Sequence, residues 1–136
     1  METPSGFREL RHTADWEIEV WAHDLAGLFE QAALGMYALS GTQLRAQPRH
    51  TRTLALAAPD PESLLVRFLA ELLYLGEQDG LGFDTFDLRL DGDRLQAHLS
   101  GAPIDIQSKE IKAVTYHNLA VRRTSRGLEV RIVFDV

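Results

Sequence analysis

The stretch KEIKAVTYHNL, residues 109–119, has a strand-forming centre crowded by ionisable side chains. Val114, Thr115 and Tyr116 are β-branched or aromatic, and such residues favour a β-strand. We therefore predict a strand over residues 109–117. The ionisable side chains that flank or interrupt its centre are Lys109, Glu110, Lys112, Tyr116 and His117. Taken alone, the pattern favours an edge strand whose lysines discourage pairing with other chains, with a functional segment as the alternative.

Further strands are predicted on both sides of this stretch. Alternating or β-branched residues place them at 16–21, 52–58, 83–90, 94–100, 118–124 and 128–135. The Asp91-Gly92 pair is a strong signal for a hairpin between the third and fourth of these strands. Residues 101–103, Gly-Ala-Pro, are expected to break the sheet, and residues 125–127 to join the last two strands.

Two amphipathic helices complete the predicted fold. Apolar side chains recur at helical spacing over residues 25–39, preceded by Asp24 as a plausible N-cap. A second helix over residues 61–75 follows Asp60 as its N-cap and is expected to stop at Gly76. The segments expected to lack regular structure are 1–11, 43–51 and 78–82. Two helices packed on a largely antiparallel sheet make an α+β fold, and we predict a single compact domain over residues 1–136.

Composition and charge exclude several classes of function. The chain has 136 residues, 45% of them hydrophobic, and no cysteine, so disulfides and thiolate metal sites cannot form. We expect a cytoplasmic protein, because no signal peptide and no membrane span can be recognised.

The net charge is −6, which disfavours direct binding of nucleic acid and suits a basic protein partner. The arginines of the last hairpin, Arg122, Arg123, Arg126 and Arg131, are interpreted as a solvated face.

Carboxylates near the two ends of the chain are the best candidates for a metal site. Asp15 precedes the first predicted strand, whereas Asp135 and the α-carboxylate of Val136 follow the last apolar residues. Each has an ordinary alternative, a turn aspartate for the first and a frayed terminus for the others. If the three groups meet, they must be protonated or hold a cation. An all-oxygen set suits Ca²⁺ or Mg²⁺ better than zinc.

The chain resembles the archease family, small proteins that act as cofactors of an RNA ligase. The motifs that carry this resemblance follow one another over nearly the whole chain, at residues 12–15 (HTAD), 28–33 (LFEQAA), 68–74 (FLAELLY), 110–117 (EIKAVTYH) and 134–136 (FDV). Asn118 stands where the family often has glycine, and Asn tolerates a left-handed backbone well. The resemblance implies that the partner is the RNA-splicing ligase of tRNA splicing or RNA repair. The chain would promote guanylylation of that ligase's active-site histidine and support its multiple turnover.

The resemblance also implies which residues form the site. The family's metal ligands correspond to Asp15, Asp135 and the Val136 carboxylate, and its functional lysine corresponds to Lys112. His12, Glu30, Glu71 and His117 are weaker candidates, since each has a ready structural explanation as a solvated helix residue or a histidine satisfied by the backbone.

Two other functional classes remain as alternatives: a small metal-dependent hydrolase using the same carboxylates, and a general protein chaperone. The sequence contains neither a Gly-x-Ser-x-Gly nucleophile motif nor a phosphate-binding Gly-Lys-Ser/Thr loop. We therefore expect an accessory activator without catalytic residues of its own.

Overall fold

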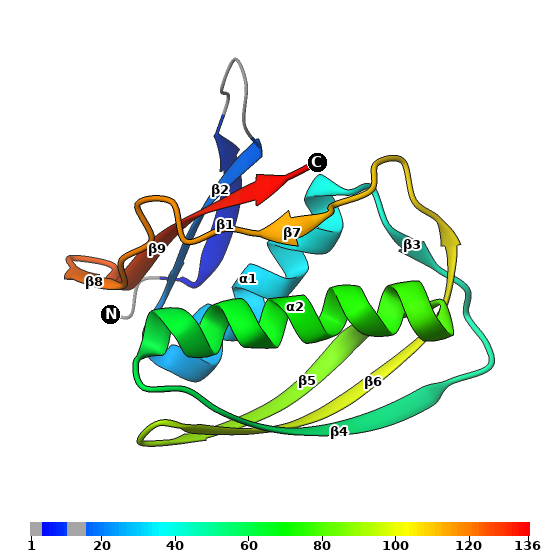
Figure 1. Ribbon diagram of the computed structural model, residues 1–136, viewed down its shortest axis with the longest axis horizontal. Coiled ribbons are helices and arrows are strands. Elements are labelled where there is room, and N and C mark those ends of the chain that lie inside the picture. Colours follow the sequence, from blue (N-terminus) through cyan, green and yellow to red (C-terminus); the bar gives the residue numbers. More distant parts are fainter. Residues whose placement is uncertain (1–3, 11–15) are drawn as a thin grey trace.

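Two antiparallel β-sheets pack against two helices (Figure 1). The computed structural model describes residues 4–10 and 16–136. The first sheet has the order β1-β2-β9-β7, with β8 also paired to β9, and contains β1 (Gly6–Leu10), β2 (Trp16–Ala22), β7 (Ala113–Val114), β8 (Arg122–Thr124) and β9 (Gly127–Asp135). The second sheet has the order β3-β6-β4, with β5 also paired to β6, and contains β3 (Gln43–Leu44), β4 (His50–Ala57), β5 (Leu81–Asp91) and β6 (Arg94–Ile106). The α+β class predicted from the sequence is confirmed.

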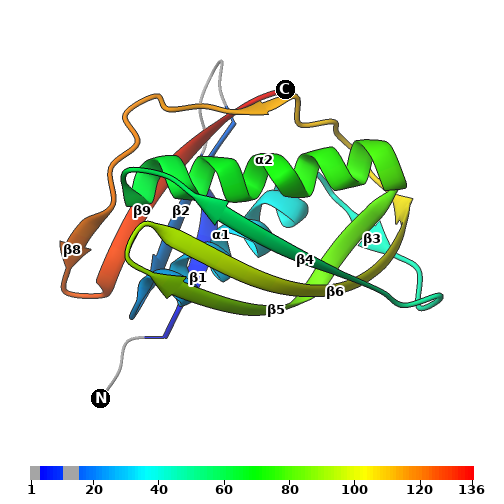
Figure 2. The same ribbon diagram turned by 60° about the horizontal axis from the view of Figure 1, so that its bottom comes forward.

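The helices α1 (Leu25–Leu39) and α2 (Pro61–Asp79) lie against each other and supply much of the core (Figure 2). Phe68 of α2 stacks on Phe29 of α1, with ring centroids 5.8 Å apart, and meets Phe86 of β5 edge-on at 6.4 Å. Inward-facing residues of both sheets complete the core, among them Ile18, Val20, Phe83, Leu95, Leu99, Val130, Ile132 and Phe134. The core therefore joins both helices to both sheets.

Local capping signals fix where the helices begin. The Asp24 carboxylate accepts a hydrogen bond from the Gly27 N–H at 2.8 Å, and Asp60 does the same for Ser63 at 2.7 Å. Both caps satisfy N–H groups that have no partner within the helix. The predicted stop at Gly76 is wrong, because α2 continues for one further turn to Gly80, which has φ +67° and donates to the Gly76 carbonyl.

The predicted strand over residues 109–117 is wrong in most of its length. Only Ala113 and Val114 pair with β9. Before them, the N–H groups of Ser108 and Lys109 both donate to the Ser40 carbonyl at 3.0 Å, which draws the chain to the end of α1. After them, the chain turns away from β9 through residues 116–119, where Asn118 has φ +52°. Tertiary hydrogen bonds therefore override the local strand propensity.

Other expected boundaries also change. β6 runs without a break through residues 101–103, and the strand predicted over 118–124 is reduced to β8. The lead-in 1–11 contains β1, and the loops expected at 43–51 and 78–82 contain β3, the start of β4, the end of α2 and the start of β5. The added strand residues have one cause, because β1, β3, β4, β5 and β6 extend where a neighbouring strand offers hydrogen bonds.

An ion-pair network covers the outer face of the first sheet. Glu19 of β2 is only 5% exposed, and its carboxylate is 2.7 Å from the Arg126 guanidinium. Arg8 and Arg131 approach the same carboxylate at 3.3 and 3.5 Å. Arg126 also binds Glu129 and lies 4.1 Å above the Trp21 ring. The Arg126 guanidinium thus links β2, β9 and the β8–β9 turn.

This network should make the stability of the protein depend on pH. The Arg126 hydrogen bond lowers the pKa of Glu19 against the opposing effect of burial, and it also lowers the pKa of Glu129. A carboxyl whose pKa is lowered by folding contributes its full stability above its unfolded value, near 4.5, and loses it as the pH falls further. Urea unfolding of Glu19→Gln should show a loss of about 1.5–3 kcal/mol at pH 7 that shrinks toward pH 3.

The control for this prediction is Glu9→Gln, which changes an exposed residue of β1. It should change the free energy of unfolding at pH 7 by no more than about 0.5 kcal/mol. An equal loss at pH 3 and pH 7 in Glu19→Gln would mean that packing, and not the ion pair, carries the effect.

Candidate functional site

Three segments that are distant in sequence meet at one end of the first sheet. Trp16, the first described residue of β2, is in register with Phe134 of β9. On the other side of β9, Ala113 is in register with Asp135, and the Lys112 N–H donates to the Asp135 carbonyl at 2.7 Å. Figure 1 shows the C-terminal end of β9 beside β7. The sheet therefore brings the segment containing Lys112 next to the last carboxylates of the chain.

Asp135 and Val136 differ in their surroundings. Asp135 is exposed, and its backbone completes the pairing with β7. Val136 is half-buried and packs against the core, which holds the end of the chain in place. Asp15 and His12 lie outside the described residues, so their predicted roles remain predictions. Among residues 4–10 and 16–136 no three metal-ligating side chains form a cluster, and a carboxylate site here would need Asp15 as well.

The donor chemistry at this end of the sheet fits a hard divalent cation. The Asp135 side chain and the Val136 α-carboxylate supply only oxygen, and the described residues around them offer no cysteine. Oxygen donors favour Ca²⁺ or Mg²⁺ over softer metals. The residues present are therefore compatible with the cation expected from the sequence.

The two lysines of this region have different environments. Lys112 is exposed and lines a cavity of about 470 Å³ together with Glu77 and Glu110. Lys109 is half-buried, and its ammonium lies 3.5 Å above the centroid of the Trp16 ring. A cation held over an aromatic face in this way contributes about 0.5–1 kcal/mol at an exposed site. Lys109 therefore has a structural role that the sequence did not indicate.

The weaker candidates are not drawn into this cluster. Glu30 and Glu71 are half-buried on α1 and α2, and no hydrogen bond or ion pair in the described part of the chain joins either to Lys112 or Asp135. His117 is exposed, and its Nε2 lies 3.3 Å from the Asn118 side-chain nitrogen. The structure gives these residues no shared chemistry.

Glu62 has a positioning role that sequence reasoning missed. Its carboxylate accepts a hydrogen bond from the Val121 N–H at 2.8 Å and so fastens the segment after Asn118 to the first turn of α2. The sequence shows Glu62 only as an acid favourable to a helix N-terminus. Its partner is 59 residues away, and no local pattern could identify that contact.

The structure is that of an α+β protein in which the segment containing Lys112 is hydrogen-bonded through its backbone to the chain end at Asp135. The sequence model of the Archease protein family matches residues 7–136, and the chain belongs to that family. It is 35% identical to "Protein archease" of Methanosarcina barkeri, over 96% of this chain and 95% of the relative. It is 32% identical to "Protein archease" of Thermococcus gammatolerans, over 85% of this chain and 87% of the relative.

A solved structure has the same fold. The solution structure of Methanobacterium thermoautotrophicum protein 1598 superposes with a TM-score of 0.72 at 26% sequence identity, covering 96% of this chain and 99% of that one. No helix among the described residues is long and apolar enough to cross a membrane.

Proposed function

We propose that this protein activates an RNA-splicing ligase by promoting guanylylation of the ligase's active-site histidine and its multiple turnover. Membership of the archease family supports an accessory, protein-cofactor role. The observation that carries the proposal is the hydrogen bond from the Lys112 N–H to the Asp135 carbonyl, because it joins the two best candidate segments.

The metal site that we propose is formed by Asp15, Asp135 and the α-carboxylate of Val136. The covalent chain supports this grouping, since Asp15 directly precedes Trp16, and Trp16 is paired with Phe134. A bound Ca²⁺ or Mg²⁺ would supply positive charge that can orient carboxylate and phosphate oxygens. Lys112 would add a compact ammonium at the same end of the sheet.

The partner in this proposal is a protein and not RNA. The net charge of −6 repels a phosphate backbone and suits a ligase whose own surface is basic enough to hold RNA. Such activation would take place in the cytoplasm, in tRNA splicing or RNA repair.

Reconstitution with an RNA-splicing ligase tests the proposal. Adding the protein should raise the rate of guanylylation, and Lys112→Ala should lower that rate at least tenfold, about 1.4 kcal/mol, with an unchanged melting temperature. Because Lys112 is exposed, its removal should alter stability by no more than about 0.5 kcal/mol. Lys112→Arg tests whether the charge or the shape of the side chain matters, since it keeps the positive charge but replaces a compact ammonium with a broad, planar guanidinium.

Lys109→Ala is the matched control, since it removes a nearby positive charge that contacts Trp16. It should lower stability slightly and leave guanylylation intact, whereas equal losses of rate in both variants would rule out a specific role of Lys112. Hydrolysis of RNA or nucleotide by the pure protein, lost in Asp135→Asn, would instead favour the hydrolase alternative.

A further inference from the structure

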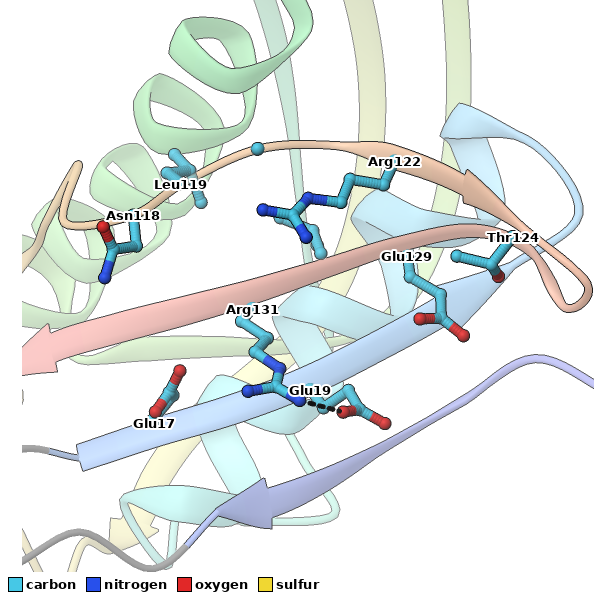
Figure 3. A pocket seen from close by; sticks show the side chains of 10 residues that line it. Glu17, Glu19, Asn118, Leu119, Arg122, Thr124, Glu129 and Arg131 are labelled. Atoms are coloured by element: carbon cyan, nitrogen blue, oxygen red, sulfur yellow. Dashed lines mark ion pairs between the residues drawn. The ribbon is translucent and has the colours of Figure 1, made fainter.

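The outer face of the first sheet contains a groove at a gap in its hydrogen-bond ladder. β7 pairs with β9 at residues 134–135 and β8 pairs with it at residues 127–129. Between these two pairings the chain arches away from β9 and encloses a groove of about 640 Å³ (Figure 3). A volume of this size is typical of sites for small molecules.

A backbone N–H of β9 faces this gap. The Thr115 N–H donates to the Val133 carbonyl, so the polar backbone atoms of Val133 point toward the β7 side. Alternation along the strand turns those of Arg131 to the same side. Neither β7 nor β8 pairs with Arg131, and Arg131 lines the groove. The gap therefore leaves the Arg131 N–H donor and the Arg131 carbonyl without a ladder partner at the floor of the groove.

Among the described residues, Arg122 is the groove-lining cation without a hydrogen-bond or ion-pair partner. Its cross-strand neighbour on β9 is Glu129, which Arg126 already engages. The other guanidinium lining the groove, that of Arg131, is paired with Glu19. No hydrogen bond or ion pair is formed by the Arg122 guanidinium within the described residues, and Figure 3 shows it directed into the space between the arch and β9.

The side chains that line the groove carry three negative charges and two positive ones, and two arginines outside the lining form ion pairs with two of these glutamates. The lining groups are Glu17, Glu19, Glu129, Arg122 and Arg131, and the arginines outside the lining are Arg8 and Arg126. Each of these glutamates already has an interaction, two of them with Arg126. Among the described residues, the Arg122 guanidinium is thus left without a carboxylate partner.

We propose that this groove binds a small oxyanion, a carboxylate or a phosphate, through the guanidinium of Arg122 and the backbone N–H of Arg131. The planar fork of arginine matches both anions with two parallel hydrogen bonds. The Asn118 amide lines the same groove and supplies a further donor. This site lies on the outer face of β9 and is separate from the cluster at Asp135.

Titration of the ¹⁵N-labelled full-length protein tests the site without any ligase. Sodium phosphate and sodium acetate, added separately at constant ionic strength, serve as probes, and the signals followed are the Arg131 amide and the Arg122 Nε–H. We expect saturable shifts of both. If only phosphate saturates the shifts, the ligand carries a phosphate. If only acetate does, the ligand carries a carboxylate. If both do, the site recognises the oxyanion chemistry that the two share.

Arg122→Ala should weaken the affinity for the saturating anion at least tenfold. Arg123→Ala is the matched control, because the Arg123 side chain lines a different cavity on the other face of β8. Glu129→Gln should strengthen binding, since it removes the negative charge opposite Arg122. Shifts that do not saturate with either probe, or an affinity unchanged in Arg122→Ala, would overturn the proposal.

Discussion

Asp135→Asn should abolish binding of divalent cations and reduce ligase activation by about a hundredfold, close to 2.7 kcal/mol, without changing the melting temperature. The side chain of Asp135 is exposed, and the strand pairing of this residue uses only its backbone. The substitution therefore removes a ligand charge and keeps the shape of the chain end. Calorimetry with CaCl₂ and MgCl₂ measures the first effect, and the rate of guanylylation measures the second.

Asp91→Asn is the control, because it changes an equally exposed aspartate at the β5–β6 hairpin. Adding a residue after Val136 is a second probe, since it converts the α-carboxylate into an amide. Unchanged Ca²⁺ affinity in the extended protein would remove that carboxylate from the site, and unchanged affinity in Asp135→Asn would remove the whole site.

The parts of the fold that sequence reasoning predicts well are those set by local chemistry. Asp24 and Asp60 mark the first turns of both helices, since a capping side chain and the N–H group it satisfies are only three residues apart. The Asp91-Gly92 turn between β5 and β6 has a local cause as well, and Gly92 adopts φ +62°.

The errors arise where distant partners decide the conformation. A strand is expected to begin at residue 109 because of the β-branched and aromatic residues that follow, but the N–H groups of Ser108 and Lys109 bond to Ser40 at the end of α1. β6 continues through Pro103 because β5 pairs with it as far as Leu81. Gly76 has no conformational signal of its own and sits within α2, whereas Gly80 supplies the left-handed cap.

The candidate site shows the same division. Asp135 and Lys112 could be selected from the family resemblance, but their juxtaposition depends on the register between β7 and β9. That Arg122 has no partner among the described residues could not be predicted from the sequence, because its cross-strand neighbour Glu129 is paired with Arg126 instead. A residue's chemistry is visible in the sequence, while its competition for partners is not.

Gly101→Ala should be the most destabilising single substitution considered, with a loss of more than about 4 kcal/mol. Gly101 lies in β6 where the register with β5 shifts between Phe83 and Thr85. A Cβ atom at this position would lie 1.8 Å from the Gly82 carbonyl oxygen and 2.7 Å from the Phe83 Cα. Both are backbone atoms of the adjacent strand, so the sheet itself would have to separate. Urea and thermal unfolding measure the loss.

Gly82→Ala is the matched control, because it adds the same methyl group one strand away. Its Cβ would meet the Cδ2 of Leu44 at 2.5 Å, but that atom ends a half-exposed side chain on the short strand β3 and can rotate aside. The expected cost is therefore only about 1–2 kcal/mol. Similar unfolding midpoints for Gly101→Ala and Gly82→Ala would show that β5 and β6 can part at the register shift, and that the close approach at Gly101 is not required for the fold.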